Sequence, residues 1–538
     1  MWLTPYTLYS WLLDGSTQKD GPFRAVFSFL IAMLAISLWH LWTNRKSNKP
    51  IAPLPPGPRG LPIVGYLPFL GTDNLHLVFT ELAGVYGPIF KLWLGNKLCV
   101  VITSPSLAKE VVRDHDITFS ERDPPIAAQV STFGCNDIAF DSYSSPTWKK
   151  KRKILVSGML SSGSLNAFYG LRKEQVMNTI GEVYKNVGEP IDVGELSYLT
   201  AINAVTSMVW GGKLGGEKRA TIKGHFKEIS SELAILLGKP NVSDIFPAIA
   251  RFDIQGIERG VKKVIHLFNQ LFDSVIELRT NVATEKDKVD GKSEQKSDFL
   301  QMLLELNKNE HSASSITMNQ VKGMLMDIVV GGTDTTSTMV EWTMAELIQH
   351  TEIMEKVKKE LTDVVGLDRT VEEFHLPNLR YLNAVIKETF RLHPALPLLV
   401  PRCSGKSITV GGYTIPKGSR VFLNIWSIHR DPHIWDNPLQ FQPDRFLNDP
   451  DKFDYYGSDF RYMPFGSGRR KCPGLTLGEK MLYFILASLL HSFDWKLPQG
   501  TEHDLSSKFG LVVKKKKPLL LIPTPRLPNL ELYRKKQL

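Results

Sequence analysis

The chain is dominated by stretches in which apolar residues recur every three or four positions. Residues 317–350 and 352–364 keep this spacing over several turns, which predicts two long amphipathic helices. Shorter stretches rich in β-branched and aromatic residues predict strands at residues 88–95, 97–103 and 407–425. A glycine pair and a Pro-Lys-Gly sequence divide the last stretch into separate strands. The pattern therefore predicts a mainly α-helical protein with a minor β-sheet region.

A continuous apolar stretch at residues 25–42 stands apart from this pattern. His40 is its only titratable residue, and Trp39 and Trp42 lie at one end, where indole rings favour a membrane interface. A helix over this stretch would measure about 27 Å, close to the hydrocarbon thickness of a bilayer. No small-residue cleavage site follows, which argues against a cleaved signal peptide. The sequence predicts a retained transmembrane helix within an N-terminal membrane anchor at residues 1–50.

A proline-rich stretch, residues 51–65, follows the anchor. Proline lacks a backbone donor and disfavours helix at its own position and at the residue before it, so this stretch predicts a stiff, extended hinge. Residues 66–523 show no internal repeat and predict one large domain, and residues 524–538 predict a C-terminal tail. Within the domain, the charged residues 284–298 predict a surface loop.

Composition narrows the class of protein. The formal net charge of +10 suits an acidic membrane surface or an acidic protein partner. The basic residues are spread along the chain without a dominant arm, which disfavours nucleic-acid binding. The four cysteines have no paired spacing, which favours a reducing compartment over a disulfide framework. A zinc site built from all four is a less favoured alternative, because such sites usually use close pairs.

One cysteine stands in an unusual setting. The stretch FGSGRRKCPG, residues 465–474, places glycines and three cations before Cys472, and a proline and a glycine after it. Nearby cations favour the thiolate, which is the form that binds metals. Glycines allow a backbone to approach a bulky group closely. The stretch therefore predicts a metal-ligating Cys472 in a loop that lies against a large cofactor.

The long predicted helix carries the sequence GGTDTT at residues 331–336. Each glycine costs about 1 kcal/mol relative to alanine in a helix, so the pair needs a reason. Thr335 follows one turn later, and a threonine hydroxyl can bond the carbonyl four residues before it. One interpretation is a groove for a small ligand, lined by this hydroxyl beside Asp334. The alternative is close packing against another helix.

Further charged residues are candidates for the same site. Trp148 and Arg152, four residues apart on a predicted helix, can present an indole NH and a guanidinium to a carboxylate. Glu388 and Arg391 share one face of another helix, although pairs of this kind are common at surfaces. Two more arginines stand among prolines, Arg402 and Arg445.

The order and spacing of these motifs resemble those of the haem-thiolate monooxygenases of the cytochrome P-450 superfamily, in their plant microsomal form. The resemblance covers essentially the whole chain. The family's cysteine signature is matched by Phe465, Gly468, Arg470, Cys472 and Gly474. Its oxygen-binding helix motif is matched by residues 331–336, its ion-pair network by Glu388, Arg391 and Arg445, and its propionate-binding helix by Trp148 and Arg152.

The resemblance implies a haem b cofactor with Cys472 as the axial ligand of its iron. It implies that Asp334 and Thr335 line the site where O2 binds and deliver protons there. Glu388, Arg391 and Arg445 would form a buried network that supports the fold and does no chemistry. The remaining matches would hold the cofactor: Trp148, Arg152, Arg402 and Arg470 at its propionates, and Phe465, Gly468 and Gly474 in the loop beneath it.

The resemblance also implies partners and a location. Electrons would come from NADPH through NADPH-cytochrome P-450 reductase, for which the cations at residues 149–152 suit an acidic docking face. The anchor and hinge would make a single-pass protein of the endoplasmic reticulum membrane, in contact with lipid. Residues 66–523 would be a haem-thiolate catalytic domain in the cytosol. The lysines at residues 514–517 are interpreted as a solvated or membrane-facing surface.

The family's chemistry leaves the substrate to be predicted. An isomerase of peroxides or a haem sensor is less favoured than a monooxygenase, because relatives that isomerise hydroperoxides tend to lose the acid–threonine pair. The segments expected to line the pocket are largely aliphatic, aromatic or small, which predicts a hydrophobic substrate held by shape. These segments are residues 126–140, the helix face around Ile328 and Met339, residues 395–400 and residues 509–513.

Two substrate classes fit such a pocket. The amino-acid sequences of residues 52–83 and 331–347 are similar to those of a plant branch that contains (+)-δ-cadinene 8-hydroxylase. That resemblance implies hydroxylation of a cyclic sesquiterpene, such as (+)-δ-cadinene, in plant defence. The alternative is a flavonoid or another phenolic compound, with Ser131, Asn136 and Asp137 orienting a hydroxyl group.

Overall fold

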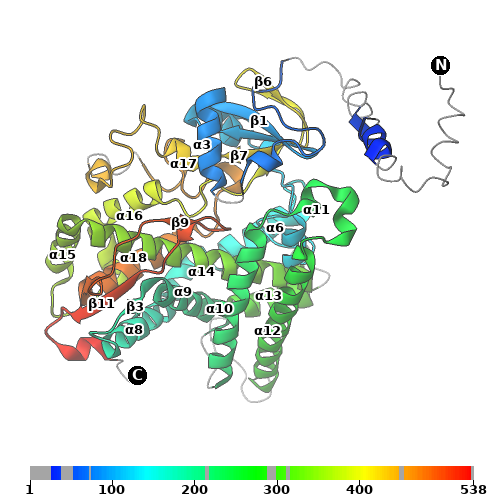
Figure 1. Ribbon diagram of the computed structural model, residues 1–538. Coiled ribbons are helices and arrows are strands. Elements are labelled where there is room, and N and C mark those ends of the chain that lie inside the picture. Colours follow the sequence, from blue (N-terminus) through cyan, green and yellow to red (C-terminus); the bar gives the residue numbers. More distant parts are fainter. Residues whose placement is uncertain are drawn as a thin grey trace, which may run out of the picture.

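The computed structural model describes residues 26–34, 36–37, 52–71, 74–211, 217–286, 298–309, 315–447 and 453–534. Helices make up most of this part, and small sheets lie at its margins (Figure 1). The predicted mainly α-helical fold with a minor β-sheet region is confirmed. The two predicted long helices are α14 and α15, with bounds within a few residues of those expected.

The helices differ widely in length. The longer ones are α3 (Leu75–Tyr86), α6 (Pro146–Gly158), α8 (Tyr169–Lys185), α9 (Val193–Trp210), α10 (Glu217–Gly238), α12 (Ile257–Lys286), α13 (Phe299–Lys308), α14 (Met318–Gln349), α15 (Thr351–Val365), α16 (Arg380–Leu392) and α18 (Leu475–Ser492). The shorter ones are α4 (Pro105–Lys109), α5 (Ile126–Ser131), α7 (Ser162–Ala167), α11 (Val242–Ile245) and α17 (Ile425–Ile428).

The strands form four separate sheets. Their bounds are β1 (Ile89–Leu94), β2 (Lys97–Ile102), β3 (Ile191–Asp192), β4 (Arg402–Cys403), β5 (Ile408–Val410), β6 (Tyr413–Ile415), β7 (Arg420–Leu423), β8 (Phe493–Lys496), β9 (Ser507–Lys508), β10 (Lys514–Lys515) and β11 (Leu520–Pro525). The largest sheet has the order β1-β2-β7-β4, and the others are β3-β11-β8, β5-β6 and β9-β10. The predicted glycine turn joins β5 to β6, where Gly411 and Gly412 have φ values of +56° and +81° that favour glycine.

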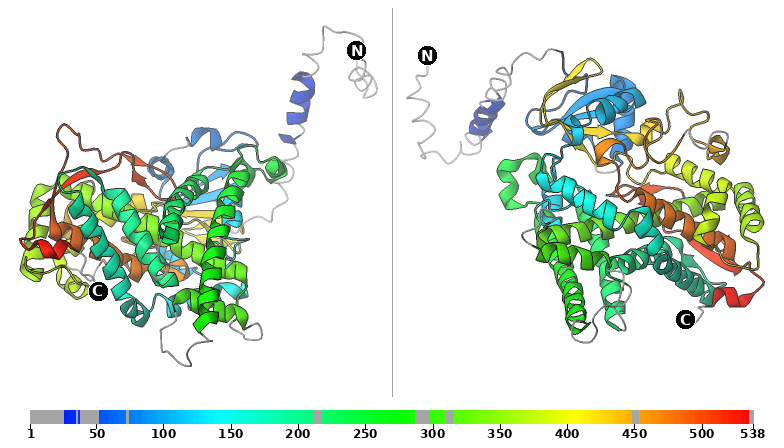
Figure 2. Two further views of the ribbon diagram at one scale, coloured as in Figure 1. Left: turned by 90° about the horizontal axis from the view of Figure 1, so that it is seen from below. Right: turned by 180° about the vertical axis from the view of Figure 1, so that it is seen from behind.

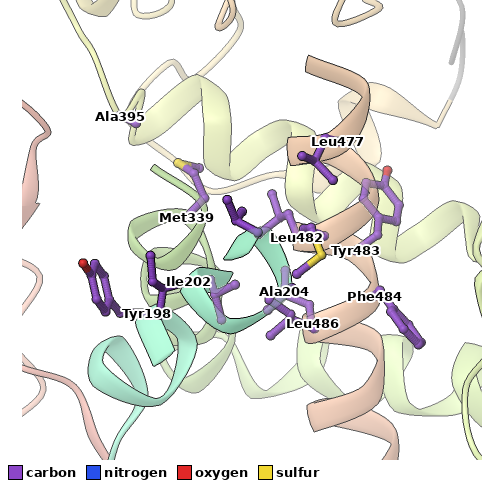
Figure 3. Packing of buried hydrophobic residues seen from close by; sticks show 14 of the residues in the cluster. Tyr198, Ile202, Ala204, Met339, Ala395, Leu477, Leu482, Tyr483, Phe484 and Leu486 are labelled. Atoms are coloured by element: carbon purple, nitrogen blue, oxygen red, sulfur yellow. The ribbon is translucent and has the colours of Figure 1, made fainter. Parts of the chain in front are cut away.

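Three helices form the centre of the molecule. α9, α14 and α18 bring Ile202, Met339 and Leu482 into one buried cluster (Figure 3). α14 begins with a capping box, in which the Thr317 hydroxyl accepts the Gln320 amide and the Gln320 side chain accepts the Thr317 amide. Because α14 passes through this core, side chains at its centre are held firmly by neighbours from distant parts of the chain.

A second apolar contact joins two longer helices at the side of the core. α10 and α12 run next to each other in all views (Figure 2). The ring of Phe226 on α10 meets the ring of Phe268 on α12 edge-on, with centroids 5.5 Å apart. This pair of helices covers the side of α5, which belongs to one predicted pocket segment.

The proline-rich stretch has no helix or strand over residues 53–60, turns back on itself between Leu61 and Gly65, and packs against the domain. The Pro56 carbonyl accepts the Lys91 amide of β1 at 2.7 Å, and the Pro53 carbonyl accepts the Thr414 amide of β6 at 2.8 Å. A Cβ at Gly57 would lie 1.9 Å from the Lys91 carbonyl oxygen, so only glycine fits there. The hinge is therefore anchored to two sheets.

The N-terminal prediction falls largely outside the described residues. Residues 26–34 and 36–37 are helical and mostly exposed. Among the helices that the structure describes, none is both long enough and apolar enough to span a membrane. The predicted surface loop at residues 284–298 also lies mainly outside the described residues, although residues 284–286 continue α12.

Candidate functional site

The cysteine loop makes a tight turn before α18. The Cys472 amide donates to the Phe465 carbonyl at 3.0 Å, which closes the loop. Gly466 and Gly468 have φ values of +69° and +70°, which strongly favour glycine. A Cβ on Gly468 would lie 2.4 Å from the Val112 carbonyl oxygen. The signature glycine at 468 is thus required for the turn and for packing against the neighbouring chain.

Opposing influences act on the Cys472 thiol. Burial raises its pKa, while the Gly474 amide and the Arg152 guanidinium act in the opposite direction. α18 begins at Leu475, so the positive end of its helix dipole also lies near the sulfur. Binding to a metal ion would favour the thiolate further, because a coordinated thiol is deprotonated. The surroundings of the sulfur therefore suit a thiolate that is bound to a metal ion.

The predicted propionate-binding residues come together around one carbonyl. The indole NH of Trp148 and Nη1 of Arg470 each donate to the Ile138 carbonyl, both at 3.0 Å. The Arg470 guanidinium also lies over the Trp148 ring, 4.6 Å from its centre. Residues from the cysteine loop and from α6 are therefore fixed against each other by a third segment of the chain.

Arg152 and Arg402 attach to the cysteine loop on either side of this point. Nη2 of Arg152 donates to the Lys471 carbonyl at 2.7 Å, directly before Cys472. Nη2 of Arg402 donates to the Ser467 carbonyl at 2.7 Å. Burial lowers the pKa of Arg402 to about 10. All four residues predicted to hold propionates thus gather around the loop, although they are separated widely in sequence.

Arg122 also belongs to this cluster, and the sequence analysis missed it. Its Nη1 donates to the Val400 and Pro401 carbonyls, both at 2.7 Å, and its Nε donates to the Ala139 carbonyl at 3.1 Å. Burial, together with the charges of Arg470 and Arg402, holds the pKa of the Arg122 guanidinium well below its usual value. An arginine placed shortly before two prolines is a weak sequence signal on its own.

On α14, the two glycines of the GGTDTT motif serve different purposes. Gly331 is exposed, and a Cβ built there would meet open space. A Cβ on Gly332 would lie 3.2 Å from a methyl group of Val205 on α9. The Thr335 hydroxyl donates to the Gly331 carbonyl at 2.7 Å, as the motif predicted. Gly332 thus permits helix packing, as the second interpretation expected, whereas Gly331 and Thr335 form an open face of α14, and the ligand groove stays a prediction.

Asp334 lies beside this open face, but its carboxylate points to a lysine from another segment of the chain. Its carboxylate accepts from Nζ of Lys514 on β10 at 2.8 Å. The interpretation of residues 514–517 as a solvated or membrane-facing surface is wrong for Lys515, which is buried, and it is incomplete for Lys514, which is half-exposed but ion-paired. Lys514 pairs with Asp334, and Lys515 is buried over the Trp342 ring, 5.2 Å from its centre.

Asp327 is a second acid of α14 that the sequence analysis did not single out. Its Oδ2 accepts the Ile138 amide at 2.6 Å. One turn earlier, a Cβ on Gly323 would lie 2.6 Å from the Asn136 carbonyl oxygen. These two positions hold the loop that carries the Ile138 carbonyl against α14. Burial and the neighbouring Asp137 carboxylate raise the pKa of Asp327 well above its usual value.

The pair at Glu388 and Arg391 is fully buried rather than a surface decoration. Nε and Nη2 of Arg391 donate to the two oxygens of Glu388 at 2.7 and 2.9 Å. Nε of Arg445 donates to the same carboxylate at 3.1 Å, and the Gln442 amide does so at 2.8 Å. The network joins α16 to the segments that precede the cysteine loop.

Several polar residues proposed from sequence have other partners. The Asn136 amide group and the Ser131 hydroxyl donate to carbonyls of their own loop, and Asp137 accepts the Phe140 amide. Of the cations proposed for reductase docking, Lys151 is buried and pairs with Asp141 at 2.8 Å. Lys150 donates to the Ser315 carbonyl, whereas Lys149 is exposed. The charge available for docking on α6 is smaller than the sequence suggested.

Comparison with known protein families decides what this arrangement is. A family model described as cytochrome P-450 matches residues 55–522. This chain belongs to the cytochrome P-450 family. Members of the family use haem b and O2 with electrons supplied by a reductase, so this cytochrome P-450 is an oxidoreductase.

Curated relatives cover nearly the whole length of this cytochrome P-450. A flavonoid 3'-monooxygenase of Crocosmia x crocosmiiflora is 37% identical over 94% of this chain and 99% of its own. A carnosic acid synthase of Salvia pomifera is 37% identical, over 92% and 98% of the two chains. Among solved structures, a zebra fish cytochrome P450 with progesterone has a TM-score of 0.71 and 28% identity, covering 84% of this chain and 100% of that one.

The residues around the cysteine loop fit a haem group. Arg122 and Arg470 donate to backbone carbonyls, and the contact of Arg402 with Asp116 is long at 3.5 Å. These guanidinium groups are thus held mainly by neutral carbonyls rather than by carboxylates, which suits the two propionates of a haem. Among the residues that the structure describes, no group of three or more His, Cys, Asp or Glu could hold a metal ion, so the zinc alternative has no support there.

Proposed function

We propose that this cytochrome P-450 hydroxylates a flavonoid or a related phenolic compound, using O2 and electrons passed from NADPH by a reductase. The observation that carries this proposal is the set of relatives. Besides the Crocosmia enzyme, a flavonoid 3',5'-hydroxylase of Campanula medium is 37% identical over 88% of this chain and 92% of its own. These relatives favour the flavonoid alternative over the cyclic sesquiterpene that the sequence alone favoured.

On the cysteine side, the proposed roles follow from charge and geometry. Cys472 would ligate the haem iron, and thiolate donation then favours cleavage of the O–O bond. The propionates would be neutralised by Arg122, Arg152, Arg402 and Arg470. Together with Trp148, these residues would hold the ring in a fixed position relative to α14. Phe465, Gly468 and Gly474 would shape the loop beneath the ring.

On the opposite side, Thr335 and Asp334 would control protons. The Thr335 hydroxyl lies on the open face of α14; its hydrogen is donated to the Gly331 carbonyl, so its oxygen would accept a hydrogen bond from a small ligand or water. Asp334 is buried beside it and would belong to the same proton path. Neither residue would act as a nucleophile, so their contribution is to supply protons in the correct place.

The substrate would be held mainly by shape. Residues 395–400 and 509–513 are joined by a hydrogen bond from the Val513 amide to the Ala395 carbonyl, at 2.9 Å. Both stretches are rich in aliphatic residues, which suits a flat or globular hydrophobic molecule. The same property keeps a cyclic sesquiterpene such as (+)-δ-cadinene as the second candidate.

Location and partner belong to the same proposal. We expect an endoplasmic reticulum protein with its catalytic domain in the cytosol, served by NADPH-cytochrome P-450 reductase. Exposed apolar side chains on the hinge, β1 and the segment after α11 support contact with lipid. They are Leu61, Phe69, Trp93, Phe252 and Ile254.

The decisive experiment compares the two substrate classes directly. Microsomes that contain the protein and a reductase are incubated with NADPH and either naringenin or (+)-δ-cadinene, and products heavier by one oxygen atom are sought by mass spectrometry. Oxidation of naringenin that requires NADPH would support the proposal. Oxidation of (+)-δ-cadinene with naringenin unchanged would overturn it in favour of the second candidate. Microsomes with Cys472→Ala serve as the control.

A further inference from the structure

The lysine run at residues 514–517 contains two kinds of side chain. Lys514 reaches inward to the Asp334 carboxylate, and Lys515 is buried. Lys516 and Lys517 are exposed, and Lys517 lies only loosely near Asp504, at 3.9 Å. Four identical residues in sequence thus divide into a pair that faces α14 and a pair that faces solvent.

Lys514 belongs to a longer segment attached to one side of α14, which we call the C-terminal strap, residues 503–519. Nζ of Lys514 meets Asp334, and the indole NH of Trp342 donates to the Val513 carbonyl at 3.2 Å. The other two attachments are the Leu519 amide to Glu341 at 3.0 Å and the His503 ring to the Ala345 carbonyl at 3.0 Å. Counted from Asp334, the other three positions come seven, eight and eleven residues later on α14, so all four lie on one side of the helix.

The strap also lines the proposed substrate pocket. Residues 509–513 precede Lys514 directly, and Val513 is bonded both to Trp342 and to Ala395. A shift of the pocket-lining residues would therefore be transmitted to Lys514 through the adjoining backbone. Because Lys514 holds the carboxylate beside Thr335, the shift would reach the proton-handling residues as well.

The two members of the ion pair differ in their exposure to solvent. The Asp334 side chain is only 6% exposed, whereas the Lys514 side chain is 40% exposed. A lysine on a flexible stem can move away from a carboxylate and return without disturbing the fold. The lysine end of the ion pair is therefore partly open, whereas the carboxylate end is enclosed.

We propose that Lys514 is a positioning residue, which holds Asp334 beside Thr335 and thereby links the pocket-lining strap to proton supply. This rests on the proposed role of Asp334. Lys514 contributes through its ion pair with the carboxylate, at 2.8 Å, and it exchanges no electrons, which come from NADPH through the reductase.

The first test measures how efficiently NADPH is used. In Lys514→Met, product formed per NADPH should fall on the order of tenfold, with a matching rise in hydrogen peroxide. The substrate dissociation constant, from the spectral change on binding, should stay within about twofold because Lys514 does not hold substrate. Lys514→Arg should recover most of the loss. Lys516→Met, two residues away, should behave as the original protein.

The second test needs no substrate. Lys514→Met leaves the Asp334 carboxylate without its cation, so the holoprotein should melt about 2 °C lower. Adding Asp334→Asn should restore most of that loss, whereas the same addition to Lys516→Met should not raise the melting temperature. Two results would overturn the inference. One is a double variant whose melting temperature is the sum of the two single effects, and the other is an unchanged yield of product per NADPH in Lys514→Met. Failure of all variants to oxidise naringenin would count against the substrate proposal alone, since peroxide yield and melting are still measured.

Discussion

In the proposed arrangement, the cysteine loop and the open face of α14 lie on opposite sides of the haem, and the two are built in opposite ways. At the loop, backbone carbonyls hold the guanidinium groups of Arg152, Arg402 and Arg470. A neighbouring carbonyl leaves room only for glycine at Gly468. On α14, Gly331 borders open space and Asp334 depends on a single flexible lysine. The first region is fixed by many contacts, whereas the second borders open space.

The contrast also appears in the ion pairs of the two regions. Arg391 and Glu388 are completely buried and doubly bonded near the segments that lead into the loop. Lys514 and Asp334 have one contact, with the lysine partly in solvent. A buried pair is costly to break, whereas a half-exposed pair is not. We therefore expect substitutions on the cysteine side to affect cofactor retention and stability, and those on α14 to affect the use of electrons.

The largest expected effect is that of Cys472→Ala. Loss of the only side chain proposed to bind iron should abolish the red-shifted absorption of the reduced carbon monoxide complex, which reports thiolate ligation. Product formation should fall to background. Retention of that absorption band would show that another residue is the ligand.

Glu388→Gln should have the second-largest effect. It leaves the Arg391 guanidinium buried without its charged partner, which costs about 3 kcal/mol of unfolding free energy. Glu355→Gln is a matched control, because Glu355 pairs with Lys358 at the same spacing but is largely exposed. It should cost less than about 0.5 kcal/mol. Equal losses in denaturant titrations of the two variants would remove the proposed distinction between buried and exposed pairs.

Thr335→Ala should leave the absorption spectrum and stability nearly unchanged while product per NADPH falls on the order of tenfold. The reason is that the hydroxyl on the open face no longer directs protons. Thr343→Ala is the control, since the Thr343 hydroxyl makes the same contact to the carbonyl four residues earlier but is buried elsewhere on α14. Unchanged coupling in Thr335→Ala would leave only a packing role for the motif.

The smallest expected effect is a difference in unfolding free energy between alanine substitutions at Gly331 and Gly332. Gly331→Ala should raise the unfolding free energy by about 0.5–1 kcal/mol, because its Cβ meets open space and alanine favours helix. It should nevertheless weaken ligand binding at the open face. In Gly332→Ala the new methyl group would press on Val205, which offsets the gain. A larger gain from Gly332→Ala, measured by thermal melting, would reverse the assignment of the two positions.

The sequence allowed the local part of this architecture to be predicted. The bounds of α14 and α15, the strands around Gly411, and the turn at Cys472 follow from residues close together in the chain, since periodicity, capping and glycine conformation act over a few positions. The Thr335 bond to Gly331 was foreseeable for the same reason. The relatives do not favour the cyclic sesquiterpene that short similar sequence segments had suggested, because such segments carry little information about the shape of the pocket.

What only the tertiary structure decided are the partners that are distant in sequence. Lys514 and Asp334 are 180 residues apart, Asp327 and Ile138 are 189 apart, and Arg122 and Val400 are 278 apart. No periodic pattern marks such pairs, because their contact depends on how whole helices and sheets pack. The sequence by itself thus determined the helices, the cysteine turn and the family chemistry. Packing decided which of four lysines meets the acid and which charges are buried, because burial and Coulomb energy depend on three-dimensional distance.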